Sequence, residues 1–370
     1  MQSVQKIPLF SLLISLLIFF LTQCATPPPF DEDEWLQRSG AADETLLYAS
    51  YVNPDGTFYN PWLQRQRRHR SGSWRRSGPV REYDAFSEAE FSHVSNDYTY
   101  LSDNNFNSIS YVGHGSFIIK TDGETIFTDP FFSDAALILR KKVRIKFDFS
   151  KIPDCSVVLI SHNHYDHFDK YSVKKMIKKG AVFIVPLGLK KTVEKWGAKE
   201  VYELGWWESI SLGSDPSAQV TYTLLPAQHW SRRLGQKGGT TLWGGFLIQG
   251  SKTFYYSGDT GYFIGFREFG RRYKIDYALL GAGAYEPRWF MHYSHMNVEE
   301  FFRAATDLGS DIAIPFHFGV IRLSEEPLLY PIYEVSKFIG QNPQYSGRVR
   351  PLRVGEHIEM FPPDPFDTSQ

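Results

Sequence analysis

A cluster of three histidines and one aspartate directly after an apolar run constrains this 370-residue chain most strongly. The run Val157–Ile160 is apolar throughout, which is typical of a strand that is buried on both faces. The cluster follows in the segment Ser161-His162-Asn163-His164-Tyr165-Asp166-His167. An incidental polar loop would rarely hold four potential ligands within six residues, so the segment predicts a metal site at the end of a buried strand.

The spacing inside the cluster divides its side chains between two directions. His162 and His164 are two residues apart, so an extended backbone points both to the same side. Asp166 and His167 come where the chain must turn, and they can face a second centre nearby. Imidazole and carboxylate are the ligands of zinc and of similar transition metals.

Three further apolar β runs also end in a potential ligand, and these ligands are His229, Asp259 and His317. A single histidine at a strand end is ordinarily structural, but here the same context recurs three times. Together with the cluster, these positions supply five histidines and two aspartates. That set suits two metals, each with three terminal ligands, and one carboxylate that bridges them.

A hairpin is predicted upstream, with strands at 109–120 and 125–128 and a turn at Asp122-Gly123. Its second strand ends at Asp129-Pro130. Asp129 can accept a hydrogen bond from a metal-bound imidazole and fix the tautomer of that ring. A plain turn aspartate is the alternative, and the sequence leaves the two open.

Strands and helices alternate after the cluster, which indicates a mixed α/β layer structure. Asp169 can cap a helix that runs to Lys179, and Gly180 can end it. Asn297 and Glu300 form a capping-box pair for a helix that runs to Leu308. We place this domain at residues 107–370.

The composition is that of a globular protein, with 42% hydrophobic and 16% aromatic residues. The net charge of −1 creates no global field that would attract nucleic acid. There are two cysteines, Cys24 and Cys155, and Cys155 is most simply a small buried apolar side chain.

Residues 1–24 are predicted to be a signal peptide. Lys6 precedes the apolar run Leu9–Leu21, which is short for a membrane span. Leu21-Thr-Gln-Cys24 resembles the lipobox of bacterial lipoproteins, although Gln23 departs from the usual small residue. The alternatives are ordinary cleavage nearby and an uncleaved anchor. Each version places the protein outside the cytoplasm, and the first and last tether it to a membrane face of the bacterial envelope.

Residues 25–106 are predicted to be a tether and an N-terminal arm. Asp31–Glu34 and the prolines before them are typical of an extended, solvated tether. The basic stretch Arg65–Arg81 is either a solvated arm or a patch that contacts anionic headgroups, and no motif for reading nucleic acid accompanies it. Residues 135–147 form an exposed helix or loop, either over lipid or in solvent.

The order His-x-His-x-Asp-His, later His, Asp and final His resembles that of the metallo-β-lactamase fold superfamily, over residues 107–355. The resemblance implies an αββα sandwich with a dinuclear site. One metal would be held by three histidines, the other by two histidines and an aspartate, with one aspartate bridging: His162, His164 and His229; Asp166, His167 and His317; Asp259.

Several motifs are similar to those of the family of phospholipases D that hydrolyse N-acylphosphatidylethanolamine (NAPE-PLD family). They are Tyr111-Val-Gly-His114, Thr128-Asp-Pro130, Gln228-His-Trp230, Gly258-Asp-Thr-Gly-Tyr262 and Gly283-Ala-Tyr-Glu-Pro-Arg-Trp-Phe-Met291 followed by His295. This resemblance implies cleavage of N-acylated phosphatidylethanolamine to phosphatidic acid and an N-acylethanolamine, with two Zn²⁺ as cofactor. The same ligand set accepts iron or manganese.

Two other interpretations stay open. One is a superfamily hydrolase of another ester, such as a lactone or a cyclic phosphodiester. The other is a lipoprotein that keeps the fold only as a binding module, against which the complete ligand set argues.

The phosphodiesterase interpretation assigns roles to individual residues. A water bridging two metals is acidified towards neutral pH, and Asp166 or Asp259 would orient it or take its proton. His295 would contact the phosphate or the leaving oxygen, or would merely neighbour a helix cap. Candidate substrate contacts are His114, Tyr285, Arg288 and Trp289.

The expected partners are a phospholipid substrate and a membrane surface, and no nucleic acid. The sequence leaves the oligomeric state open, with a homodimer among the options. Ser294 stands before His295 where the animal enzymes of the family would have glutamine, which leaves headgroup and acyl specificity open.

Overall fold

The computed structural model describes residues 30–49, 51–63, 82–103, 106–136, 138–144, 147–154, 156–213 and 219–360. The predicted signal peptide, Cys24, Cys155 and the basic stretch Arg65–Arg81 lie outside these residues.

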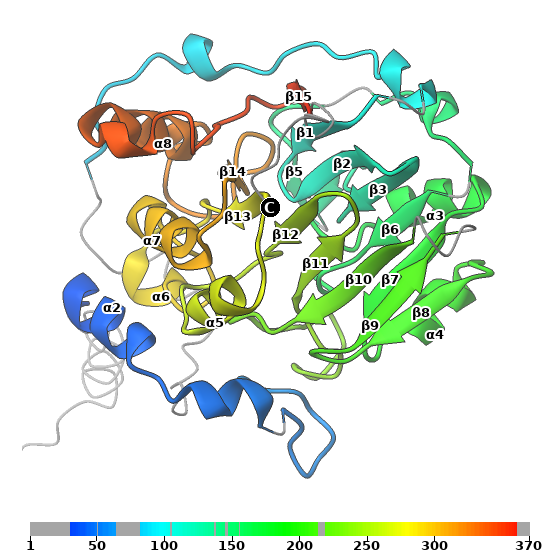
Figure 1. Cartoon of the computed structure of the whole chain (residues 1–370), viewed down its shortest axis with the longest axis horizontal. Coiled ribbons are helices and arrows are strands. Elements are labelled where there is room, and N and C mark those ends of the chain that lie inside the picture. Colours follow the sequence, from blue (N-terminus) through cyan, green and yellow to red (C-terminus); the bar gives the residue numbers. More distant parts are fainter. Residues whose placement is uncertain are drawn as a thin grey trace, which may run out of the picture.

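Two sheets face each other in the middle of the molecule (Figure 1). The first sheet has the order β15-β1-β2-β3-β6-β7-β8, with strands at His357–Glu359, Ser108–Gly113, Ser116–Thr121, Glu124–Thr128, Val157–Leu159, Val182–Pro186 and Val201–Leu204. The second has the order β14-β13-β12-β11-β10-β9, with strands at Ile312–Phe316, Tyr277–Gly281, Thr253–Tyr256, Gly245–Gln249, Val220–Leu225 and Ser209–Leu212.

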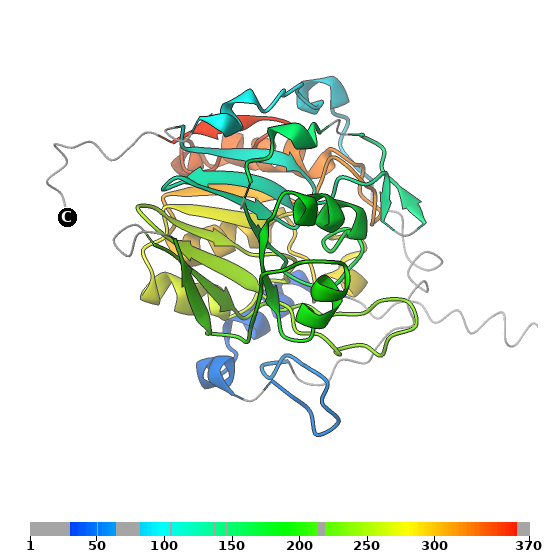
Figure 2. The ribbon, with the colours of Figure 1, turned by 90° about the vertical axis from the view of Figure 1, so that its right-hand side faces the viewer.

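Helices cover the outer face of each sheet (Figure 1 and Figure 2). The first sheet carries α3 (Lys170–Lys178) and α4 (Lys190–Lys195). The second carries α5 (Gly265–Arg272), α6 (Arg288–Met291), α7 (Val298–Leu308) and α8 (Tyr330–Gln341). The predicted αββα sandwich is therefore confirmed.

The apolar run before the histidine cluster is buried on both faces because β6 lies inside the first sheet, between β3 and β7. Val157 and Leu159 belong to the core between the two sheets. Val158 and Ile160 point the other way, into the smaller core under α3 and α4. This alternation explains why every residue of the run is apolar.

Both helix caps that the sequence predicted are present. The Asp169 carboxylate accepts the backbone N–H groups of Tyr171 and Ser172 at the start of α3. Asn297 and Glu300 form a capping box at the start of α7, and Gly309 ends that helix with φ 61°. These caps fix how the chain enters and leaves the helices beside the site.

Three segments differ from expectation. The strand predicted at 109–120 is two strands, because the chain turns at His114, whose φ is 58°. The acidic residues predicted to form a tether instead begin helix α2 (Glu32–Gly40), since the Asp31 side chain accepts the Glu34 N–H and acidic residues favour a first turn. In the segment predicted to be a helix or a loop, β4 (Ala135–Ala136) and β5 (Leu139–Arg140) form a short antiparallel pair.

The site lies where strand ends of both sheets meet. β3 and β6 are parallel neighbours in the first sheet, and β12, β13 and β14 are parallel in the second. Parallel strands bring their carboxyl ends to one edge, so the residues that follow them gather there. Among the described residues, none of the helices combines the length and the apolar character needed to cross a membrane.

Replacing Asn297 by alanine should destabilise the fold by about 1 kcal/mol, because the N–H of Glu300 loses its acceptor. Urea unfolding followed by circular dichroism measures this change. Glu299→Gln, an exposed position in the same turn, is the control and should change stability by less than about 0.5 kcal/mol. Equal effects of the two substitutions would contradict the role given to the capping box.

Candidate metal centre

Three histidines form the first half of the centre. His162 and His164 follow β6, and His229 follows β10. His164 Nδ1 lies 2.8 Å from His162 Nε2 and 3.2 Å from His229 Nε2. Asp259 Oδ2 lies 3.7 Å from both His162 Nε2 and His229 Nε2. Four potential ligand atoms therefore meet within 4.8 Å of one another.

The second half lies on the other side of Asp259. His167 Nε2 is 3.2 Å from His317 Nε2 and 3.4 Å from Asp166 Oδ2. Asp259 reaches this half as well, since its Oδ2 is 3.2 Å from His167 Nε2 and its Oδ1 is 3.0 Å from His317 Nε2. The structure thus brings together all seven residues that the sequence singled out as ligands, with Asp259 between the halves. Their roles as ligands stay a prediction.

The first group fits a metal ion. Three imidazole nitrogens converge on one point at spacings of 2.8–3.2 Å, close to the roughly 3.3 Å between nitrogens held tetrahedrally at about 2.0–2.1 Å from zinc. Burial and the neighbouring imidazoles keep the pKa of His162 and that of His229 well below the usual value, and burial lowers the pKa of His164 to about 4. The rings are therefore neutral at pH 7, as metal ligation requires.

The carboxylates are ionised. Burial alone would raise the pKa of Asp166 and of Asp259, but the His167 imidazole beside them holds both well below the usual value. Burial would likewise lower the pKa of His167, yet Asp259, Asp166 and Asp129 around it raise that pKa well above its usual value. His167 therefore holds a proton when no metal is bound, and it would release that proton on ligation. The cluster of histidines and aspartates is able to bind metal.

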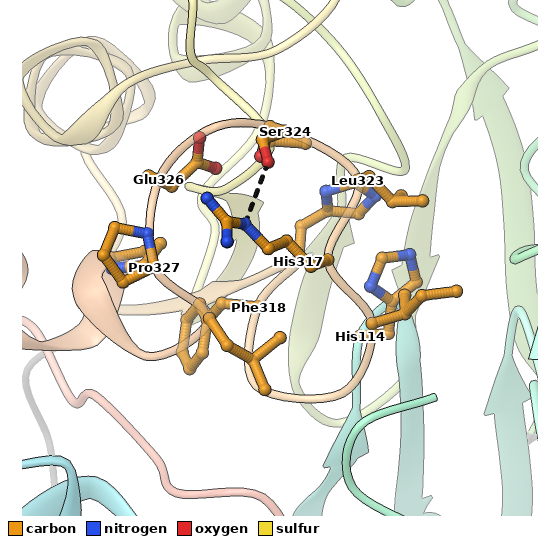
Figure 3. A pocket seen from close by; sticks show the side chains of 12 residues that line it. His114, His317, Phe318, Leu323, Ser324, Glu326 and Pro327 are labelled. Carbon is orange, nitrogen blue, oxygen red and sulfur yellow. Dashed lines mark hydrogen bonds between the residues drawn. The ribbon is translucent and has the colours of Figure 1, made fainter. Parts of the chain in front are cut away.

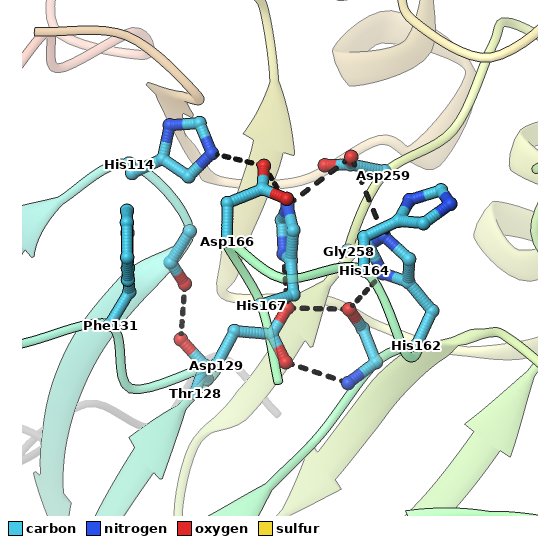
Figure 4. A network of polar contacts seen from close by, with 12 residues as sticks. His114, Thr128, Asp129, Phe131, His162, His164, Asp166, His167, Gly258 and Asp259 are labelled. Atoms are coloured by element: carbon cyan, nitrogen blue, oxygen red, sulfur yellow. Dashed lines mark hydrogen bonds and ion pairs between the residues drawn. The ribbon is translucent and has the colours of Figure 1, made fainter. Parts of the chain in front are cut away.

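Asp129 holds the cluster in place from below (Figure 4). Its Oδ2 lies 2.7 Å from His167 Nδ1 and accepts a hydrogen bond of 2.7 Å from the Tyr256 hydroxyl. The backbone N–H and the hydroxyl of Ser161 donate to the two oxygens of the same carboxylate. This arrangement leaves His167 Nε2 facing the centre and fixes the ring through its other nitrogen.

His114 contacts the centre directly, and it also lines a small pocket beside the centre. The turn between β1 and β2 places its Nε2 2.7 Å from Asp166 Oδ2, and the side chain is buried (Figure 4). It forms a group of four potential ligands with Asp166, His167 and His317. The sequence predicted only a substrate contact for His114. Its partner Asp166 follows 52 residues later, so the two residues form no local motif.

Two predicted headgroup contacts were wrong. Tyr285 is fully buried, and its hydroxyl donates to Glu334 Oε2 at 2.6 Å. Arg288 is also buried, and it pairs with Glu32 and Glu300. Trp289 is half-buried, and its role as a headgroup contact stays a prediction. Arg288 supports the site from outside, since its Nη1 donates to the His295 carbonyl at 3.1 Å.

His295 does lie at the centre. It forms a group with Asp259 and His317 in which the potential ligand atoms lie within 4.8 Å of one another. Its ring is 5.1 Å from that of His317 and 5.4 Å from that of His229. Because His295 is only half-buried, it faces the open side of the centre.

The sequence did not reveal the loop after β14. A small pocket lies here, with His114 and His317 at one side, and it is lined by Phe318, residues 321–324, residues 326–328 and Pro331 of α8 (Figure 3). Arg322 is exposed here, and its Nε donates to the carbonyl of Ser324 at 3.2 Å. The only signal was the position of this loop, directly after the ligand-bearing strand end.

Asp129→Asn should weaken metal binding roughly 10- to 100-fold, because asparagine keeps the shape but loses the charge that polarises His167. Competition with a calibrated chelator, read by metal analysis, measures this. Asp134→Asn changes the same charge at an exposed position and should leave the affinity unchanged. Equal affinities of wild type and Asp129→Asn would contradict the role of Asp129.

Comparisons with known proteins agree with this geometry. The family model described as "Beta-lactamase superfamily domain" matches residues 124–318, which is more than half of the chain. An uncharacterized protein of Mycobacterium tuberculosis is 32% identical over 238 residues, which cover 61% of this chain and 62% of that protein. N-acyl-phosphatidylethanolamine-hydrolyzing phospholipase D 1 of Caenorhabditis elegans is 32% identical over 225 residues, covering 57% of this chain and 63% of the relative.

The chain spans just over three fifths of the length of these two relatives. Among solved structures, Igni18, a metallo hydrolase from the archaeon Ignicoccus hospitalis, matches with a TM-score of 0.52 and 23% identity. That match covers 70% of this chain and 99% of Igni18, and it bears on the fold alone. The chain belongs to the beta-lactamase superfamily and has the metallo-β-lactamase fold.

Proposed function

We propose that this chain is a metal-dependent phosphodiesterase that cleaves N-acylphosphatidylethanolamine, releasing phosphatidic acid and an N-acylethanolamine. The observation that carries the proposal is the pair of ligand groups joined by Asp259. Its carboxylate lies 3.7 Å from the first group at His162 and 3.0 Å from the second at His317. A phosphoryl group needs charge neutralisation on more than one oxygen, and two adjacent cation sites suit that need.

Metals bound in such a site acidify water and withdraw charge from the phosphoryl oxygens. The side chains of the protein would orient the attacking water. Asp166 accepts from His114 at 2.7 Å, which fixes one of its oxygens and leaves the other to orient the attacking water or take its proton. Asp129 holds His167 in turn, so the second half of the centre rests on buried polar contacts.

His295 is the group best placed for the leaving oxygen. It is half-buried at the open side of the centre, and it lies near both Asp259 and His317. The phosphate would be bound between this side chain and Asp166 by metals that the neighbouring ligands hold. Burial lowers the pKa of His295 to about 3, so the ring is neutral at pH 7 and would stabilise the departing oxygen by donating a hydrogen bond from its N–H.

The lipid part of the proposal rests on the relatives and on the surface beside the centre. Two relatives at 32% identity, from yeast and from Caenorhabditis elegans, are named as phospholipases D that hydrolyse N-acyl-phosphatidylethanolamine. Trp230 is 47% exposed, and its ring lies 4.3 Å from that of His164. An exposed indole next to a ligand provides apolar surface for an acyl chain.

We also propose zinc as the metal and a membrane-tethered location outside the cytoplasm. Nitrogen and carboxylate ligands suit zinc, and the signal-like N-terminus suits the location. Metal analysis of protein purified without added metal tests the first. Mass spectrometry of the mature N-terminus tests the second, because a lipidated Cys24 has a distinct mass.

The test is product analysis on vesicles that contain N-acylphosphatidylethanolamine. The wild type should release phosphatidic acid, and Asp166→Asn should reduce the rate at least roughly 10³-fold, because the carboxylate that orients the nucleophile is lost. Asp134→Asn is the matched control and should keep the wild-type rate.

A wild type that binds metal but yields no phosphatidic acid would contradict the proposal. Hydrolysis of a lactone or a cyclic phosphodiester by the same preparation would then favour another ester as substrate. Protein that neither binds metal nor cleaves any of these esters would favour a binding module.

A further inference from the structure

The N-terminal segment contacts two parts of the chain that carry residues of the centre. One is the stretch 288–297, which includes α6 and His295. The other is Gln228-His229, directly after β10. In Figure 1, α2 lies beside α6 and α7, although these two helices come much later in the sequence. The proposed function makes no use of these contacts.

Helix α2 contacts the first part, residues 288–297, through one charged and one aromatic residue. Glu32 Oε1 lies 2.8 Å from Arg288 Nε. Trp35 is buried, its indole N–H donates to Glu300 Oε1 at 2.8 Å, and its ring meets that of His292 edge-on at 4.5 Å. Arg288 Nη2 lies 2.8 Å from Glu300 Oε2, which closes a buried network.

This network reaches the backbone on both sides of the His295 side chain. Arg288 Nη1 donates to the His295 carbonyl at 3.1 Å. Glu300 Oε2 accepts the backbone N–H of Asn297 at 2.9 Å. The guanidinium uses its planar fork for three different partners, which a lysine cannot do. The backbone of His295 therefore depends on contacts that begin at α2.

The second part is held in a similar way. Asn60 Nδ2 donates to the His229 carbonyl at 2.9 Å, and the Trp62 indole N–H donates to Gln228 Oε1 at 3.1 Å. Gln228 Nε2 donates in turn to the Tyr293 carbonyl at 3.1 Å. His229 Nδ1 lies 3.2 Å from the Ser294 carbonyl, which leaves Nε2 for the centre.

We propose that residues 32–62 act as a clamp that positions His295 and His229 for the reaction. Glu32 and Trp35 are positioning residues that act through Arg288 and Glu300, and neither of them touches the centre itself. The expected effect on catalysis rests on the proposed function of the centre and on the role of His295 in it. The expected effect on the backbone of residues 288–297 does not.

Two mild substitutions test the clamp. Glu32→Gln weakens the pairing with Arg288, and Trp35→Phe removes the pyrrole ring with its N–H and keeps one aromatic ring. Glu34→Gln makes the same charge change as Glu32→Gln on the same helix, at a side chain that is 66% exposed, so it is the matched control.

Hydrogen exchange read by mass spectrometry should show amides of 288–297 exchanging roughly tenfold faster in Glu32→Gln and in Trp35→Phe. Glu34→Gln should exchange like the wild type. With bis(4-nitrophenyl) phosphate as a soluble substrate, kcat should fall roughly tenfold in both clamp variants, while KM and metal content stay within about twofold.

A double-mutant cycle separates positioning from a general structural effect. In a His295→Ala background, Glu32→Gln should cause no further loss of kcat, because the path through His295 is already broken. The same tenfold loss in both backgrounds would overturn the positioning role. Unchanged exchange at 288–297 would overturn the clamp even if the wild type proved inert towards phosphodiesters, so the two proposals fail separately.

Discussion

The burial of two carboxylates, Asp166 and Asp259, among seven imidazoles is the constraint on which the rest of this structure depends. Asp166 and Asp259 are 8% and 5% exposed, and a buried carboxylate is costly unless charges and hydrogen bonds compensate it. His114, His167 and His317 supply those contacts, at 2.7–3.2 Å in the shortest cases. Metal ions would supply the remaining positive charge. The arrangement therefore favours a metal centre over a structural polar core.

That constraint explains why the scaffold takes the form it does. Both faces of the first sheet are buried, so a polar side chain can leave the core only at a strand end. Asp129 sits at such an end and ties together Ser161, His167 and Tyr256, which come from both sheets. The centre therefore helps to join the two halves of the sandwich, and changes at Asp129 reach both.

The sequence predicted well the fold class and the meeting of seven potential ligands at one site, because their signals are local. An apolar run followed by His or Asp marks a strand end, and Asn297 with Glu300 marks a helix start within four residues. It predicted poorly wherever a side chain's partner lies far along the chain. His114 meets Asp166 52 residues later, and Arg288 meets Glu32 256 residues earlier, so neither contact leaves a local pattern. Helix α2 also has a distant partner, since the buried Trp35 donates to Glu300, but its acidic first turn after Asp31 is a local signal that the tether prediction overlooked.

The central claim is that two metal ions share Asp259, and anomalous diffraction from crystals of the full chain tests it most directly. We expect two peaks, one within bonding distance of His162, His164 and His229 and one within bonding distance of Asp166, His167 and His317. Both peaks should lie beside the Asp259 carboxylate. A single peak, or two peaks of which one lacks contact with Asp259, would contradict the shared-carboxylate site.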